Sequence, residues 1–257
     1  MILIDTHTHL YLNQFDNDRA ETIHRSLDKN VLVHLLPNID RESIPALLHM
    51  AQSFPASCFP MMGLHPTSVK DDFETELNTV ITEIETGKYI GIGEIGIDLY
   101  WDKTFREQQE EVFKQQLVLA DKLGLAVSIH SRNSLDIILK IINDLALPGL
   151  KGILHCYPGN LAQARKAIEM GLYLGIGGVV TYKNSGLQEV IRVVGCDHLV
   201  LETDAPFLPP VPYRGQRNES SYLPFIAERI AWITGMEVEE VAAKTTENAL
   251  QLYPIKL

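Results

Sequence analysis

The chain has 257 residues, of which 46% are hydrophobic and 21% are charged, a length and composition typical of one globular domain with a sizeable core. Its 33 acidic and 22 basic residues give a net charge of −11, which argues against a protein that coats nucleic acid through charge alone. The sequence shows no apolar run of about 18 residues, no signal-peptide pattern and no CxxC pair among its cysteines, so we expect a cytoplasmic protein with reduced thiols and no membrane partner.

Eight short hydrophobic segments are predicted to form strands, and stretches with helical spacing lie between them. The predicted strands cover residues 2–5, 31–36, 58–62, 89–93, 126–129, 152–154, 173–176 and 198–201. Helical periodicity is clearest over residues 107–123, 133–145, 161–170, 222–234 and 238–252. This alternation predicts an α/β fold with parallel strands, closed into a (β/α)8 TIM-type barrel that forms a single domain over residues 1–257.

An open, doubly wound sheet is the alternative arrangement for alternating strands and helices. No GxGxxG motif follows the first predicted strand, so the nucleotide-binding form of that fold lacks its main signature. The proline-rich stretch 207–212 has the composition of a linker, but only residues 213–257 follow it. We therefore expect this stretch to form a loop over the mouth of a barrel.

Residue types that bind metals gather where the predicted strands end, which is where barrels of this kind build their active sites. The first strand leads into His7 and His9, and both imidazoles face the same way because side chains alternate along a strand. Residues of the same chemical type follow later strands: His65, Glu94, His130, His155 and Asp204.

Each of these residues has an ordinary structural interpretation when taken alone. His130 and His155 are each compatible with a hydrogen-bonded core histidine, and Glu94 and Asp204 are each compatible with a helix cap. The imidazoles of His7, His9, His130 and His155, together with two carboxylates on the same rim of one barrel, instead predict a metal centre. That is too many ligands for one tetrahedral ion with an open position, but it suits two divalent ions.

We expect the carboxylate of Glu94 to bridge the two ions. The other ligands divide into His7, His9 and Asp204 for one ion and His130 and His155 for the other. The mixed nitrogen and oxygen donors suit Zn, Fe, Co or Mn as bound ions, and we expect Mg or Mn to support turnover.

Asp204 is the expected catalytic base, because its carboxylate can orient a water molecule and accept its proton, while Glu94 acts through its bridging position. The dipeptide His155-Cys156 permits a second interpretation, a cysteine nucleophile paired with histidine. That interpretation is weaker because His155 is already assigned as a metal ligand.

Three arginines follow the fifth and eighth predicted strands on the same rim: Arg132, Arg214 and Arg217. They are candidates for phosphate binding, because a guanidinium can donate two parallel hydrogen bonds to a phosphate. Ion pairs with nearby carboxylates are the alternative for each of them. Aromatic residues of the rim loops are candidates to stack on bases or to pack against the barrel: Tyr182, Phe207 and Tyr213.

Seven motifs, in this order and spacing, resemble the TatD family of metal-dependent deoxyribonucleases in the amidohydrolase-like superfamily: DTHTHL, GLHP, GEIGID, HSR, HCYPG, ETDAP and RGQRN. The resemblance extends from Asp5 to the region of Asn248. It implies a TIM-type barrel and a metal-dependent hydrolase that releases nucleotides from DNA ends. Position by position, it implies metal ligands at His7, His9, Glu94, His130, His155 and Asp204. It also implies that His65 and Arg132 lie near the bound phosphate, with Tyr157 beside the same pocket.

Three positions depart from the usual pattern of that family. Thr8 stands where the family often has cysteine, HCYPG replaces the commoner HCF-S/T-G, and Ser220 stands where a proline often follows the glutamate. None of these changes removes a ligand, but those at Tyr157-Pro158 and Ser220 leave the natural substrate open.

The leading hypothesis is a phosphodiesterase that uses two metal ions, a DNase acting at 3′ ends, with DNA or a nucleotide phosphodiester bound locally and no obligate protein partner. The alternative is an amidohydrolase-type enzyme that cleaves a small-molecule amide or ester or an aminoacyl bond. Many binuclear enzymes of that type bridge their ions with a modified lysine, so a glutamate at position 94 favours the nuclease. A non-catalytic binding protein would tolerate loss of a ligand, yet all six are present.

Overall fold

All eight predicted strands are present and alternate with helices in the computed structural model, which describes residues 1–87 and 89–257. The strands are β1 (Leu3–Asp5), β2 (Val31–Pro37), β3 (Cys58–Met61), β4 (Gly91–Asp98), β5 (Ala126–Arg132), β6 (Gly152–Leu154), β7 (Leu172–Ile176) and β8 (Leu199–Leu201). The α-helices are α1 (Arg19–Asp28), α2 (Ile44–Ser53), α3 (Phe73–Glu85), α4 (Arg106–Leu123), α5 (Leu135–Leu145), α6 (Leu161–Glu169), α7 (Leu187–Val194), α8 (Leu223–Thr234) and α9 (Val238–Leu252). Among the described residues, no helix is both long and apolar enough to span a bilayer.

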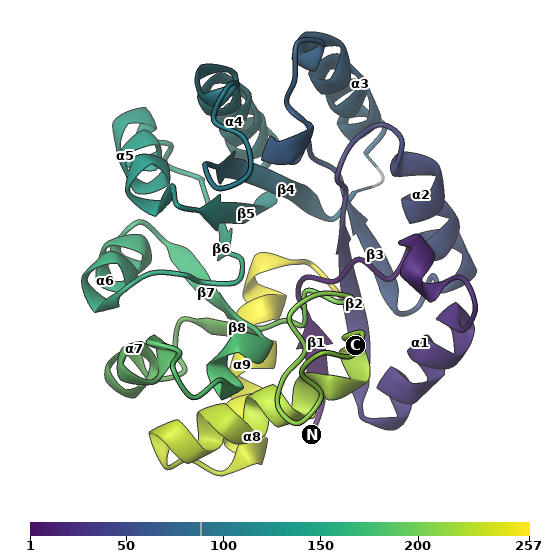
Figure 1. Cartoon of the computed structure of the whole chain (residues 1–257), viewed down its shortest axis with the longest axis vertical. Helices are drawn as coiled ribbons and strands as arrows, with labels where there is room; N and C mark the ends of the chain where they lie inside the picture. Colours follow the sequence, from purple (N-terminus) through teal and green to yellow (C-terminus); the bar gives the residue numbers. More distant parts are fainter. Residues whose placement is uncertain (88) are drawn as a thin grey trace.

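Backbone hydrogen bonds close the strands into a ring surrounded by helices (Figure 1). Strands β1 to β3 pair in parallel, and so do strands β4 to β8. The two groups meet where the N–H of Met62 donates to the carbonyl of Gly91 (3.2 Å), and where the N–H of Thr6 donates to the carbonyl of Leu201 (3.0 Å). The predicted (β/α)8 barrel is thereby confirmed, and the open sheet is excluded.

The interior of the barrel is filled by one small hydrophobic cluster, separate from the larger cluster between strands and helices. Its strand residues are Ile4, Val33, Leu35, Met61, Ala126, Ile153 and Val200. Leu252 and Tyr253, at the end of α9, pack against this cluster, and Tyr253 is fully buried beside Gly91 at the start of β4. The end of α9 therefore closes the barrel where its strands begin, and the opposite end remains for a site.

Strands β4 and β5 run further than the predicted segments 89–93 and 126–129. They stay paired to their ends, with Gly96 opposite His130 and Asp98 opposite Arg132. Gly96 has φ of 146°, and a Cβ there would lie 2.0 Å from the carbonyl oxygen of His130, so only glycine permits this approach. As a result Glu94 and His130 lie within strands β4 and β5.

The loop after β8 is tied to α1 by ion pairs. Arg217 Nη1 lies 2.7 Å from Asp18 Oδ1, and Arg25 Nη2 lies 2.6 Å from Glu219 Oε2. The hydrogen bond from Arg217 is the main reason that the pKa of Asp18 lies well below its usual range, although partial burial opposes the shift. These contacts join segments about 200 residues apart in sequence and hold the loop beside the first helix.

We predict that Arg217→Ala lowers the free energy of unfolding by about 0.5–1 kcal/mol at pH 7, because the pair is partly exposed and screened by solvent. Since the pKa of Asp18 is lowered by folding, its contribution is complete above its unfolded pKa of about 4 and is lost as the pH falls below that value. Urea denaturation at pH 7 and pH 3 checks both points. A difference between variant and wild type that does not shrink at pH 3 would contradict the assignment.

Candidate metal centre

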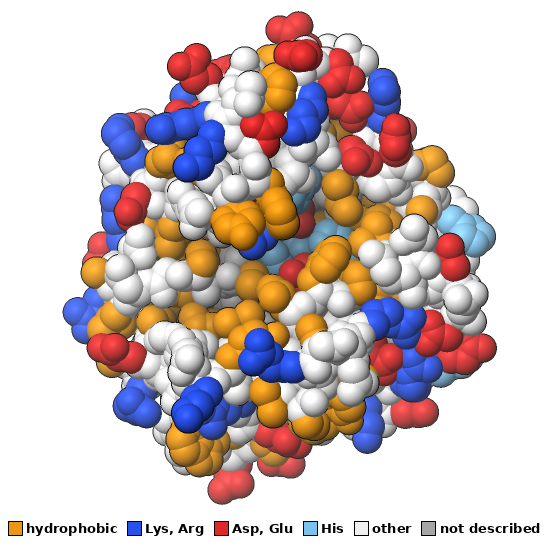
Figure 2. All heavy atoms as spheres, viewed as in Figure 1, with side chains coloured by type: hydrophobic (Ala, Val, Ile, Leu, Met, Phe, Trp, Pro, Cys, Tyr) orange, Lys and Arg blue, Asp and Glu red, His pale blue; other side chains and the backbone are white. Residues whose placement is uncertain are grey.

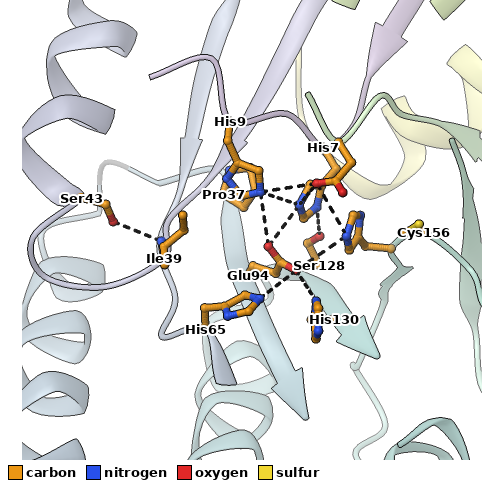
Figure 3. A network of polar contacts seen from close by, with 12 residues as sticks. His7, His9, Pro37, Ile39, Ser43, His65, Glu94, Ser128, His130 and Cys156 are labelled. Carbon is orange, nitrogen blue, oxygen red and sulfur yellow. Dashed lines mark hydrogen bonds and ion pairs between the residues drawn. The ribbon is translucent and has the colours of Figure 1, made fainter. Parts of the chain in front are cut away.

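His7 and His9 follow β1 and converge on the carboxylate of Glu94 in β4 (Figure 3). Their Nε2 atoms lie 3.2 Å apart, and they lie 3.2 and 3.4 Å from Glu94 Oε2. Donor atoms around a tetrahedral ion with metal–nitrogen distances of about 2.0–2.1 Å lie roughly 3.3 Å from one another. These three donor atoms therefore have the spacing of one coordination shell.

The hydrogen bond of His9 Nδ1, the ring nitrogen that faces away from the centre, leaves Nε2 free to bind a metal. Tyr11 donates its hydroxyl proton to the carbonyl of Pro37 (2.7 Å), so its oxygen accepts from His9 Nδ1 (3.1 Å). With the proton of neutral His9 on Nδ1, the lone pair of Nε2 faces the centre. His7 Nδ1 likewise contacts the hydroxyl of Ser128 (2.9 Å).

The second oxygen of Glu94 faces a different group of histidines. Glu94 Oε1 lies 2.8 Å from His130 Nδ1, 3.4 Å from His65 Nε2 and 3.6 Å from His155 Nε2. The other nitrogen of His130, Nε2, contacts Asp98 Oδ2 at 3.0 Å. The two oxygens of one buried carboxylate are thus divided between two clusters of possible ligands.

Asp204, which follows β8, and His155, which follows β6, complete the set. Asp204 Oδ1 lies 3.7 Å from His9 Nε2, 3.8 Å from His7 Nε2 and 4.0 Å from His155 Nε2. His7, His155 and Asp204 form one group able to hold an ion. Asp204 has a left-handed backbone (φ 58°), a conformation that aspartate tolerates better than most residues.

The carboxylate of Glu202 contacts the ring nitrogen of His155 that faces away from the centre. Its Oε1 lies 3.1 Å from His155 Nδ1, and the carboxylate is fully buried. The space for it exists because residue 175 is glycine: a Cβ there would lie 2.2 Å from Glu202 Oε2. A carboxylate behind a histidine fixes the orientation of the ring and makes its inner nitrogen a stronger ligand.

The charges of the site divide its histidines between neutral and protonated forms. Burial and the neighbouring His155 lower the pKa of His7 well below its usual range. Burial opposes charge on His155 too, but the carboxylates of Glu202, Glu94 and Asp204 outweigh it and raise the pKa of His155 to about 10. Burial raises the pKa of Asp204 to about 6, against the effect of His155 and His9. A bound cation would replace the proton that the carboxylates attract.

The donor set therefore fits divalent metal ions. It combines imidazole nitrogens with carboxylate oxygens at ligand spacing, and carboxylates or hydroxyl groups hold the outer nitrogens of four of the histidines. Such a mixed set is typical of Zn, Mn, Fe or Co sites.

All the candidate ligands except His7 line a cavity of about 750 Å³ that opens at the strand ends. Figure 2 shows the hollow, with histidine and carboxylate atoms inside it and hydrophobic side chains around its mouth. Phe207 and Leu208, in the proline-rich stretch 207–212, line the cavity. The expectation that this stretch forms a loop over the barrel mouth is thereby confirmed.

The predicted substrate residues fall into two groups. His65, Arg132 and Tyr157 line the cavity, and the hydroxyl of Tyr157 donates to the carbonyl of Asn160 (2.8 Å). Arg214 and Arg217 are not among the described residues that line it. Arg214 stacks over the ring of Tyr182 (4.3 Å), and Arg217 is held by Asp18, so their roles in substrate binding stay predictions.

The cysteine interpretation of the His155-Cys156 dipeptide finds no support in the geometry. Burial raises the pKa of Cys156 well above its usual range, and the negative charges of Glu202 and Asp204 add to the effect. A thiol is a poor nucleophile under these conditions, because the thiolate is the reactive form. His155 is also turned towards carboxylates on both of its nitrogens.

Four residues that support the ligands were not predicted: Tyr11, Asp98, Ser128 and Glu202. Each stands two residues from a ligand in sequence or, for Asp98, four residues after Glu94 in the same strand. Asp98 and Ser128 lie within strands, where even spacing places side chains on one face, so this pattern was a usable signal for those two.

We predict that Glu202→Gln lowers metal affinity about 10–100-fold, because it removes the negative charge behind His155 while keeping the shape of the side chain. Competition with a chelator of known affinity measures the change. Glu83→Gln is the matched control, since Glu83 accepts a hydrogen bond from Tyr89 (2.8 Å) away from the site. Equal affinity in wild type and Glu202→Gln would contradict the assigned role.

Comparison with known proteins places this arrangement in a family. The family model described as TatD related DNase matches residues 4–254. The chain is 37% identical over 255 residues to the Bacillus subtilis protein named uncharacterized metal-dependent hydrolase YabD, covering 99% of this chain and 100% of that protein. It is 31% identical over 258 residues to the Erwinia tasmaniensis protein named 3′-5′ ssDNA/RNA exonuclease TatD, covering 98% and 99%.

The likeness extends to three dimensions. The crystal structure of YJJV, a TatD homolog from Escherichia coli K12, matches the fold with a TM-score of 0.93 at 27% sequence identity, over 99% of this chain and 98% of that one. The resemblance carried by the seven sequence motifs is thus confirmed. Because the family model and the relatives cover nearly the whole sequence, the chain belongs to the family of TatD-related DNases.

Proposed function

We propose that this protein is a metal-dependent hydrolase that holds two divalent ions and removes nucleotides from the 3′ end of single-stranded DNA. The observation that carries the proposal is a pair of features in one cavity: a carboxylate shared between two histidine clusters and the guanidinium of Arg132 at the wall. Within the described part of the chain, Arg132 forms no ion pair, which leaves its donors for an anionic substrate.

The division of Glu94 supports two ions rather than one. Its Oε2 faces His7 and His9, while its Oε1 faces His130 and His155. We assign His7, His9 and Asp204 to the first ion and His130 and His155 to the second, with Glu94 between them. Divalent ions bound there would activate water and stabilise negative charge on a phosphate.

The hydrogen bonds of His65 favour a role at the phosphate rather than as a ligand. The N–H of Thr67 donates to His65 Nδ1 (3.2 Å), so neutral His65 carries its proton on Nε2. That nitrogen is directed towards the centre, 3.4 Å from Glu94 Oε1, as a donor. Burial lowers the pKa of His65, which favours this neutral form.

Three residues would then act on the substrate. Asp204 orients the attacking water and accepts its proton at a carboxylate oxygen. Arg132 and His65 bind phosphate oxygens and hold the scissile bond over the floor of the cavity. Glu94 would hold the ligands of the first ion and those of the second ion at a fixed position relative to each other. No covalent intermediate with the chain is required.

Names of relatives support the nucleic acid substrate. The proteins of Erwinia tasmaniensis and Pantoea vagans, 31% and 30% identical to this chain, are both named 3′-5′ ssDNA/RNA exonuclease TatD. The fold is shared with more distant hydrolases, including a lactonase of Listeria monocytogenes with a TM-score of 0.67 at 11% identity, and that likeness concerns the fold alone. Lactones, amides and aminoacyl esters therefore form the comparison panel for activity.

The direct test supplies wild-type protein with Mg or Mn and a 3′-labelled single-stranded oligonucleotide. Mononucleotides should appear from the labelled end, and Arg132→Ala should raise KM about 10–100-fold, since a charge-assisted hydrogen bond contributes about 1.5–3 kcal/mol. Arg229→Ala is the control, because Arg229 stacks on Trp232 much as Arg132 stacks on Trp101. Hydrolysis of the panel compounds with intact oligonucleotide across all ions would refute the proposal.

Replacement of the central carboxylate should separate chemistry from folding. We predict that Glu94→Ala reduces metal content and activity to background while circular dichroism stays close to wild type, because the barrel core does not include this side chain. Glu76→Ala serves as the control, since Glu76 is also buried but pairs with Arg41 (3.0 Å) on the outer surface. Undiminished activity in Glu94→Ala would show that the bridging role is wrong.

A further inference from the structure

Two aromatic side chains stand in the turn between β4 and α4, at the mouth of the cavity. Tyr100 is 53% exposed and Trp101 is 69% exposed, the highest exposed fraction among the large hydrophobic side chains described. Trp101 also lines the cavity that holds the metal centre. The rings of Tyr100 and Trp101 meet edge to face, with centroids 4.9 Å apart.

One carboxylate connects this turn to the metal centre. Asp98 Oδ1 accepts hydrogen bonds from the N–H groups of Tyr100 (2.8 Å) and Trp101 (3.2 Å), while its Oδ2 contacts His130 Nε2 (3.0 Å). These bonds, against the effect of burial, lower the pKa of Asp98 to about 2. The turn is therefore held at a fixed position relative to the candidate ligands, even though its aromatic rings face solvent.

Arg132 lies against the same two rings. Its guanidinium carbon is 3.9 Å from the centroid of Tyr100 and 5.2 Å from that of Trp101. A phosphate bound by this guanidinium would have the indole of Trp101 beside it. In nucleic acids a base is attached to each sugar next to a phosphate, and bases stack on exposed aromatic faces.

We propose that Trp101 is a stacking surface for an unpaired nucleobase next to the phosphate that is cleaved. This inference rests on the proposed function and adds the residue that would favour a strand whose bases are free over a duplex whose base faces are already stacked. The contact is independent of base identity, because every base has an aromatic face. Trp101 would therefore contribute to affinity and to strand preference without touching the ions.

The kinetic test compares Trp101→Ala with Trp101→Phe on a normal oligonucleotide and on one whose terminal sites are abasic. Trp101→Ala should raise KM about tenfold on the normal strand with little change in kcat, and Trp101→Phe should recover most of the loss. On the abasic strand, wild type and Trp101→Ala should behave alike. Trp232→Ala is the matched control, since Trp232 is 66% exposed and stacked by Arg229, on α8.

A spectroscopic test follows from the composition, because the chain has two tryptophans. In a Trp232→Phe protein, Trp101 is the sole tryptophan, and an added Asp204→Asn change prevents turnover. Single-stranded DNA should quench its fluorescence, while abasic DNA of equal charge should not. The Trp101→Phe counterpart, which reports Trp232, should be unaffected by either strand.

The outcomes separate this inference from the proposed function. If wild type cleaves oligonucleotides and Trp101→Ala matches wild type on the normal strand as well as on the abasic strand, the stacking role is wrong and the function stands. If wild type cleaves no oligonucleotide, the function fails, and the fluorescence titration decides about Trp101 by itself. Quenching that is absent, or equal for both strands, overturns the inference.

Discussion

A buried carboxylate with two separate sets of neighbours is the constraint on which this site depends. Glu94 is only 3% exposed, and an unpaired charge at that depth would be strongly destabilising. Burial would raise its pKa, but the imidazoles of His65, His7 and His155 and a hydrogen bond from His130 lower it well below the usual range. The histidines and the carboxylate thus stabilise one another, and a change in any of them alters the charge of all.

The barrel supplies this convergence through strands that are distant in sequence. His7 comes from the first strand and Asp204 follows the last, and the N–H of Asp204 donates to the carbonyl of His7 (2.9 Å) where the ring closes. The contact that closes the barrel therefore also brings His7 and Asp204 together. The buried Asp5 reinforces the same junction, with hydrogen bonds from Thr203 and Ser220 at 2.6 Å each.

Much of this arrangement could be predicted from the sequence, because each strand is a clear hydrophobic segment and the ligand residues stand at or just after the strand ends. The lengths of β4 and β5 could not, since pairing past Glu94 depends on the close approach that Gly96 permits. The ion pair between Arg217 and Asp18 was also not predicted. Nothing local in the sequence relates Arg217 to Asp18, 199 residues away, so an arginine of the rim loops looked equivalent to its neighbours.

Leu252 and Tyr253 close the barrel at the end where its strands begin. This closure has a geometric consequence for any polymer that reaches the ligands. Because the cavity has one opening, a polymer cannot pass through the barrel and must enter and leave by the same side. A free terminus can do this without bending, whereas an internal segment must fold back on itself within the cavity. On the proposed function, the closed end of the barrel would therefore favour the terminus of a strand over an internal segment.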